Sequence, residues 1–238
     1  MQVYISNREI TQIAEGLVQA ACGHTSRRKI DIDAVAEYLG LTVVYEQIAE
    51  DDLDRIAFTS NGFRELQVIR NGQKIKVLFR KNTIVLDKFL LQPQEETRRR
   101  LALAHEISHI LIGHADPVQA APCFNSVYDK EREYRMCEMN ERMTLAECQA
   151  NMMAAMILMS AAVLTDSVRR HFRRKMIPVY GNCIFLSKTK PVLHRMATEL
   201  GVSHTALIIQ LRKYNLLEQR DMHEYFQLIM KDGGDSIE

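Results

Sequence analysis

Hydrophobic and polar positions predict two helices followed by short strands in the first 90 residues. Apolar residues recur at helical spacing over 5–21 and 31–39, and Gly40 is typical of the residue that follows a helix. Short apolar runs bounded by polar turns then predict strands at 41–45, 56–59, 66–70, 74–79 and 83–86. Asn71-Gly72 between two of them is a strong signal for a two-residue hairpin. Helices that precede a mostly antiparallel sheet indicate an α+β fold rather than an alternating βαβ fold.

Helical periodicity returns in the second half of the chain. Residues 93–113 predict a helix that starts at Pro93 and ends at Gly113, and a second helix is predicted at about 144–164. Between them, 115–128 predicts a surface loop and 129–142 is highly charged loop or exposed helix. Residues 190–215 have the spacing of a helix-turn-helix, and 231–238 predict a disordered tail. We therefore expect one domain at 1–165 and a helical, helix-turn-helix-like module at 166–238.

The composition is that of a folded protein without a strong overall charge. Of the 238 residues 47% are hydrophobic and 26% charged, and the formal net charge is +1, so contact with nucleic acid or membrane would depend on a local patch. The densest basic run is 169–175. The five cysteines are odd in number and form no C-x-x-C pair, which argues against a disulfide framework or a cysteine-rich zinc site. With no signal peptide expected, and with the longest apolar stretch, 152–164, too short for a bilayer, we expect a cytoplasmic protein without membrane contact.

The helix predicted at 93–113 contains a His-Glu-x-x-His motif. His105 and His109 lie one helical turn apart and face the same way, so that both imidazoles can bind one Zn²⁺ while Glu106 lies beside a metal-bound water. The alternative is an amphipathic helix that carries two hydrogen-bonded histidines and a solvated glutamate. The rest of the helix is apolar enough to be nearly buried, where these polar side chains are costly without a metal. We therefore predict a metal site.

A catalytic zinc site needs a third protein ligand. The metzincin pattern is excluded, because Ile112 and Ala115 stand where that class has glycine and histidine. Glu147 is the best candidate, since Asn151 follows one turn later and can orient a ligand histidine. Thr144-x-x-Glu147 also fits a capping box, and spacing alone leaves both interpretations open. The other candidates are His114, Asp116, Glu138 and Glu141.

From about residue 31 to residue 217 the chain resembles the ImmA/IrrE metallo-endopeptidases, a small gluzincin group. The motifs that carry the resemblance are Asp31-Ile-Asp33, Ala36-x-x-Leu39-Gly40, Arg99-Arg100-Leu-Ala-Leu-Ala-His-Glu-Ile-Ser-His109, Glu147-Cys-Gln-Ala-Asn151, and Leu200-Gly-Val-Ser203 with Ala206-Leu207 and Leu211-Arg212. The resemblance implies a reduced thermolysin-like domain in which His105, His109 and Glu147 bind one Zn²⁺. The chain departs from the family at Ser108, Met153 and Ser160, where glycine, phenylalanine and proline are usual, and no ligand is lost.

The expected activity is that of a zinc endopeptidase. Glu106 would act as general base on the metal-bound water. Tyr128, Tyr134 and His171 are candidates for the group that stabilises the oxyanion, and the sequence does not choose among them. The resemblance implies that the substrate is a DNA-binding repressor of the helix-turn-helix type, whose cleavage relieves repression.

The alternative function is a DNA-binding transcriptional regulator that uses the C-terminal helix-turn-helix on a protease-like scaffold. In its second helix the usual base-reading side chains come late, as Gln210 and Arg212, after mainly apolar positions. We therefore expect a module that packs on or docks protein. Its binding to nucleic acid should be at most weak and nonspecific, through the basic run at 169–175. The sequence does not indicate an oligomeric state.

Overall fold

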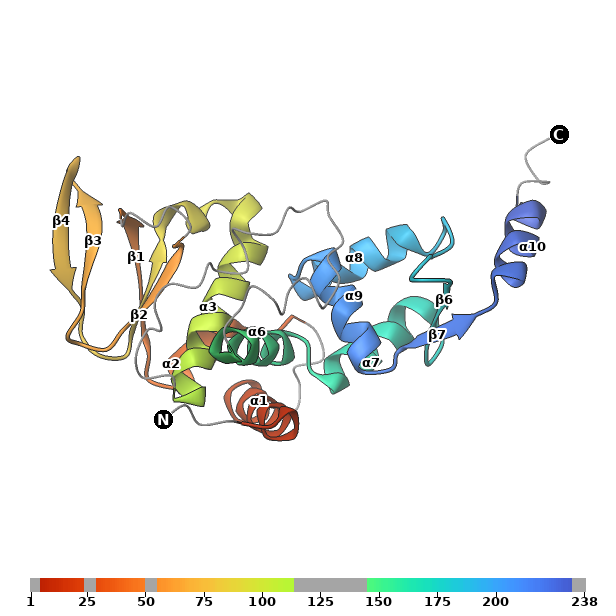
Figure 1. The fold of residues 1–238 in the computed structure, drawn as a ribbon, viewed down its shortest axis with the longest axis horizontal. Coiled ribbons are helices and arrows are strands. Elements are labelled where there is room, and N and C mark those ends of the chain that lie inside the picture. Colours follow the sequence, from red (N-terminus) through yellow and green to blue (C-terminus); the bar gives the residue numbers. More distant parts are fainter. Residues whose placement is uncertain (1–4, 24–28, 50–54, 114–144, 233–238) are drawn as a thin grey trace. The chain divides into compact units, whose positions relative to one another are not determined.

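The computed structural model describes residues 5–23, 29–49, 55–113 and 145–232 (Figure 1). The chain divides into two compact units, residues 1–160 and 161–238. The surface loop predicted at 115–128, the charged segment 129–142 and the part of the predicted tail after residue 232 lie outside the described residues. Within the described ranges, no single helix is long and apolar enough to cross a membrane. Among the described helices, the pair Leu145–Leu158 and Ala161–Phe172 reaches that length and composition only when the two are counted together.

The first unit combines helices with one five-stranded sheet, consistent with the predicted α+β class. Ser6 and Glu9 form a capping box, which explains why the first helix begins at Asn7. The Asp31 side chain accepts hydrogen bonds from two backbone N–H groups and starts the second helix. The elements are α1 (Asn7–Cys22), α2 (Ile32–Tyr38), β1 (Thr42–Ile48), β2 (Ala57–Ser60), β3 (Glu65–Arg70), β4 (Gln73–Leu78), β5 (Thr83–Asp87), the 3₁₀ turns η1 (Lys88–Leu91) and η2 (Pro93–Glu95), α3 (Glu96–Ile112) and α6 (Leu145–Leu158).

The strand order in this sheet is β2-β5-β1-β3-β4. The sheet is antiparallel as predicted except between β1 and β5, which run parallel. The β3–β4 hairpin turns at Asn71 and Gly72, whose φ angles of 52° and 75° are those of the predicted two-residue turn. Among the described strands, β2 lies at one edge of the sheet and pairs only with β5.

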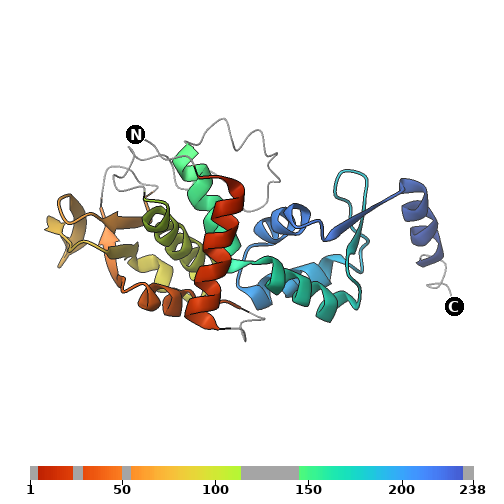
Figure 2. The same cartoon turned by 90° about the horizontal axis from the view of Figure 1, so that it is seen from below.

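Helix α3 packs on β2 and β5, and α6 packs between α3 and α1 (Figures 1 and 2). The core contains fully buried aliphatic side chains from both elements, Ile84 and Leu86 from β5 and Leu103 and Ile107 from α3. Each such side chain stabilises the fold by about 1.5–3 kcal/mol. This packing fixes both helices that carry the candidate ligands.

Where one helix is predicted at 144–164, the structure has two. Helix α6 ends at Leu158 and α7 (Ala161–Phe172) begins after a break at Met159 and Ser160. Serine favours helix boundaries because its hydroxyl competes for backbone hydrogen bonds. The break coincides with the boundary between the two compact units.

The second unit contains the two helices predicted around Gly201. Helix α8 (Lys190–Leu200) ends at Gly201, whose φ of 64° is left-handed, and the Ser203 side chain caps α9 (His204–Lys213). Three further elements were not predicted: β6 (Ile177–Tyr180) and β7 (Leu217–Arg220), which form a parallel pair, and α10 (Met222–Asp232). Because α10 includes residues 231 and 232, the prediction that the disordered tail starts at 231 is wrong at these two positions.

Candidate metal centre

The His-Glu-x-x-His motif lies in the second half of α3, as predicted. Gly113, with a left-handed φ of 73°, ends the helix one turn after His109. The His105 and His109 rings face each other edge to face, with centroids 4.6 Å apart. His105 is 5% exposed and Glu106 9% exposed, so two polar side chains of the motif are nearly buried. Burial of this kind requires partners for their polar atoms.

The Glu147 carboxylate on α6 lies against both histidines. Its Oε2 is 3.2 Å from His105 Nε2 and its Oε1 is 3.4 Å from His109 Nε2. The two Nε2 atoms are 2.9 Å apart. Donors bound tetrahedrally at about 2.0–2.2 Å from a zinc ion would be about 3.3–3.5 Å apart. The three side chains therefore form a group that could hold a metal ion, and small adjustments would reach that geometry.

Asn151 sets the tautomer of His105. Its Oδ1 lies 2.9 Å from His105 Nδ1, and an amide oxygen can only accept a hydrogen bond. His105 therefore carries its proton on Nδ1, which leaves the lone pair of Nε2 directed toward Glu147 and His109. This is the arrangement that a metal-binding imidazole needs. The interaction predicted between Asn151 and a motif histidine is present.

The charges in this group favour a cation. Burial would raise the pKa of Glu147, but the hydrogen bonds and positive charge that His105 and His109 supply in their protonated forms outweigh burial and lower that pKa. Burial would likewise lower the pKa of His109, but the hydrogen bond to Glu147 and the negative charges of Glu106 and Glu147 raise it. Two nearby carboxylates thus hold positive charge at His109, and a metal cation can supply that charge instead.

Glu106 has a partner that the sequence did not reveal. The hydroxyl of Thr59, on β2, donates to Glu106 Oε2 at 2.6 Å. The two residues are 47 positions apart, and a lone threonine in a four-residue strand carries no signal of its own. Only the packing of α3 on the edge of the sheet brings them together.

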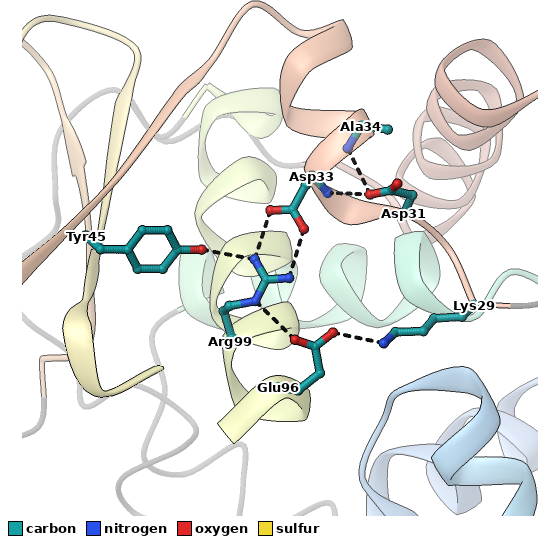
Figure 3. Close-up of polar contacts among 7 residues, drawn as sticks. All are labelled: Lys29, Asp31, Asp33, Ala34, Tyr45, Glu96 and Arg99. Carbon is teal, nitrogen blue, oxygen red and sulfur yellow. Dashed lines mark hydrogen bonds and ion pairs between the residues drawn. The ribbon is translucent and has the colours of Figure 1, made fainter. Parts of the chain in front are cut away.

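A polar network holds the first turn of α3 against α2 and β1 (Figure 3). Arg99 donates to both carboxylate oxygens of Asp33 at 2.8 Å and to the Tyr45 hydroxyl at 3.0 Å. Glu96 joins Arg99 at 3.3 Å to Lys29 at 2.9 Å. The hydrogen bond from Arg99 lowers the pKa of Asp33 in spite of partial burial. Arg99 precedes His105 by six residues, so the network anchors α3 about 9 Å along its axis from the first ligand.

The structure does not test the remaining candidates. His114, Asp116, Tyr128, Tyr134, Glu138, Glu141 and Thr144 lie outside the described residues. His171 belongs to the second unit, where its Nε2 lies 3.0 Å from Glu199 Oε2.

No protein-family model matches the chain, and no curated protein matches its sequence. A function for the chain is therefore inferred from the geometry of the candidate metal centre together with its sequence motifs.

Proposed function

We propose that the protein is a zinc-dependent endopeptidase with a reduced thermolysin-like first unit. The observation that carries the proposal is the group of His105, His109 and Glu147, with Glu106 one residue from the first ligand. Two imidazoles and one carboxylate suit zinc, and three protein ligands are typical of a catalytic site that keeps one position open. A purely structural zinc site would use four protein ligands.

Different residues of the chain would have different roles in peptide hydrolysis. Zinc bound by the three ligands would act as a Lewis acid that activates water and polarises the scissile carbonyl. Glu106 would take the proton of the attacking water and deliver it to the leaving amine. Asn151 keeps His105 in the ligand tautomer through the bond to Nδ1. Burial of Glu106 strengthens its interactions with charged groups because few water molecules screen them.

The position of β2 favours a polypeptide as substrate over a small molecule. Among the described strands, β2 has a neighbour on one side only, so its other edge presents backbone donors and acceptors. An extended peptide can add to such an edge through main-chain hydrogen bonds. Thr59 of this strand contacts Glu106, so a peptide on that edge would pass beside the metal centre. The runner-up within the zinc enzymes is an aminopeptidase or a non-peptidase hydrolase, which has the same ligands.

The proposed substrate is a DNA-binding repressor of the helix-turn-helix type, and its cleavage in the cytoplasm would relieve repression. The sequence resemblance to the ImmA/IrrE metallo-endopeptidases supports this part of the proposal. The second unit would then serve to dock the repressor.

The alternative, a DNA-binding regulator, finds little support in α9. Gln210, one of the two base-reading side chains in this helix, is 3% exposed and lies in the core of the second unit. Leu207 and Leu211 are also buried. Arg212 is exposed, but it occupies the last turn of the helix. A recognition helix needs several polar side chains at one exposed face.

The test is to incubate the zinc-loaded protein with purified repressors, and with fluorescein-labelled unfolded casein as a general substrate, and to map new termini by mass spectrometry. Glu106→Gln is the matched control. It should keep about one equivalent of zinc and lose cleavage by about two to four orders of magnitude. Full activity of Glu106→Gln would refute the mechanism, and loss of its zinc would show that Glu106 is itself a ligand.

A further inference from the structure

We infer that Thr59 is a positioning residue for the general base, an inference that rests on the proposed endopeptidase function. Its hydroxyl holds one oxygen of Glu106 and leaves the other for the reaction. Glu106 Oε2 accepts a hydrogen bond from the Thr59 hydroxyl, and the 2.6 Å between the two oxygens is within the range of about 2.5–2.7 Å for a hydroxyl bound to an ionised carboxylate. Within the described residues, Oε1 accepts no hydrogen bond.

The alternation of β2 explains why Thr59 can do this. Phe58 and Ser60 are buried on one face of the sheet, so Thr59 lies on the opposite face. Its cross-strand partner is Ile84, a fully buried residue of β5 on the same face. The backbone of β2 is thus fixed by its pairing with β5, and the hydroxyl is a rigid donor.

A glutamate needs such a donor because its side chain has three rotatable bonds. Without a partner, the carboxylate of Glu106 would sample several rotamers, and each would place Oε1 differently with respect to the metal ligands. A misplacement of about 1 Å at a reacting group can cost about 100-fold in rate. Since the donor belongs to the edge strand, the same strand that could take a peptide would also orient the base.

The experiment compares Thr59→Val, which keeps the shape of the side chain and removes the hydroxyl, with Thr59→Ser, which keeps the hydroxyl. Thr59→Val should lower kcat on fluorescein-labelled casein, or on a repressor that the wild type cleaves, by about 10- to 100-fold, as loss of a supporting hydrogen bond does. KM and zinc content should not change. Thr59→Ser should restore kcat to within a few-fold. Thr42→Val, at an exposed position of β1, controls for the substitution type.

A second measurement does not depend on activity. The infrared band of the Glu106 carboxylate, identified by subtracting the spectrum of metal-free Glu106→Gln, should shift in metal-free Thr59→Val and stay in place in Thr59→Ser. An unshifted band in Thr59→Val, or equal loss of kcat in both Thr59 variants, would overturn the inference. If the wild type cleaves neither substrate, the endopeptidase proposal fails and the catalytic role of Thr59 fails with it. If the wild type is active, Glu106→Gln is inactive and Thr59→Val is unimpaired, only the inference about Thr59 fails.

Discussion

Replacement of Glu147 by glutamine tests the metal centre directly. The change keeps the size of the side chain and removes the charge of a carboxylate that lies 3.2 Å and 3.4 Å from the two Nε2 atoms. Loss of a hydrogen-bond partner behind a ligand weakens metal binding by about 10- to 100-fold, so loss of a ligand should cost at least about 100-fold.

The loss of zinc affinity can be expressed as a smaller zinc-induced gain in the free energy of unfolding. At a free zinc concentration 100 times the wild-type Kd, zinc adds about 2.7 kcal/mol to the free energy of unfolding of the wild type, but only about 0.4 kcal/mol to that of a variant bound 100-fold more weakly. The zinc-induced rise in Tm should therefore fall from about 5–10 °C in the wild type to about 1–2 °C in Glu147→Gln. The assay is differential scanning calorimetry at buffered zinc concentrations.

Two controls separate this effect from general damage. Glu37→Gln, at an exposed position of α2, should keep the full zinc-induced rise. Thr144→Ala, which removes the hydroxyl of the alternative capping box, should also keep it. An equal rise in Tm for the wild type and Glu147→Gln would show that Glu147 is not a ligand.

Three further results are expected. Asn151→Ala should weaken zinc binding by about 10- to 100-fold in a chelator competition, because His105 loses the partner that fixes its tautomer, and an unchanged Kd would contradict that role. Asp33→Asn should lower the free energy of unfolding at pH 7 by about 1 kcal/mol or less, since this ion pair is partly exposed. The pKa of Asp33 is lowered in the folded state, so this stabilisation is complete above the unfolded pKa of about 3.9 and disappears as the pH falls through the folded pKa. The free energies of unfolding of wild type and variant, measured by urea titration, should therefore converge in acid. Nonspecific DNA binding by the basic run should weaken steeply between about 50 and 200 mM salt, and further in a variant with Arg173 and Arg174 both changed to alanine. Tight binding to one DNA sequence in a gel shift would instead favour the alternative function, a DNA-binding regulator.

The predictions that the structure confirms depend on local backbone chemistry. Asn71-Gly72 tolerates the left-handed conformations of a tight hairpin, and the strands on both sides pair as expected. Gly113 and Gly201 end their helices in the same conformation. Each of these signals acts within a few residues, so a single sequence contains it.

The features that were missed depend on contacts between distant residues. The parallel partner of β1 is β5, which pairs Thr42 with Thr83, and no local pattern specifies that choice. The contact of Thr59 with Glu106 is of the same kind. For Glu147, spacing left the ligand and capping-box interpretations open, and the position of its carboxylate between two histidines became visible only with α6 packed on α3. The break at Ser160 had a local signal, because a serine hydroxyl competes for backbone hydrogen bonds and favours helix boundaries.

The placement of the candidate ligands on two helices also has a consequence for synthesis on the ribosome. His109 and Glu147 are separated by 38 positions. At a translation rate of about 5–20 residues per second, Glu147 is therefore synthesised about 2–8 s after His109. During this interval the sheet and α3 are complete, but no metal centre of three ligands can exist. The apolar surfaces of α1 and α3 that α6 covers in the finished unit are then exposed, and such intermediates aggregate readily. The proposed metal centre therefore forms only when the helix that completes the core has docked.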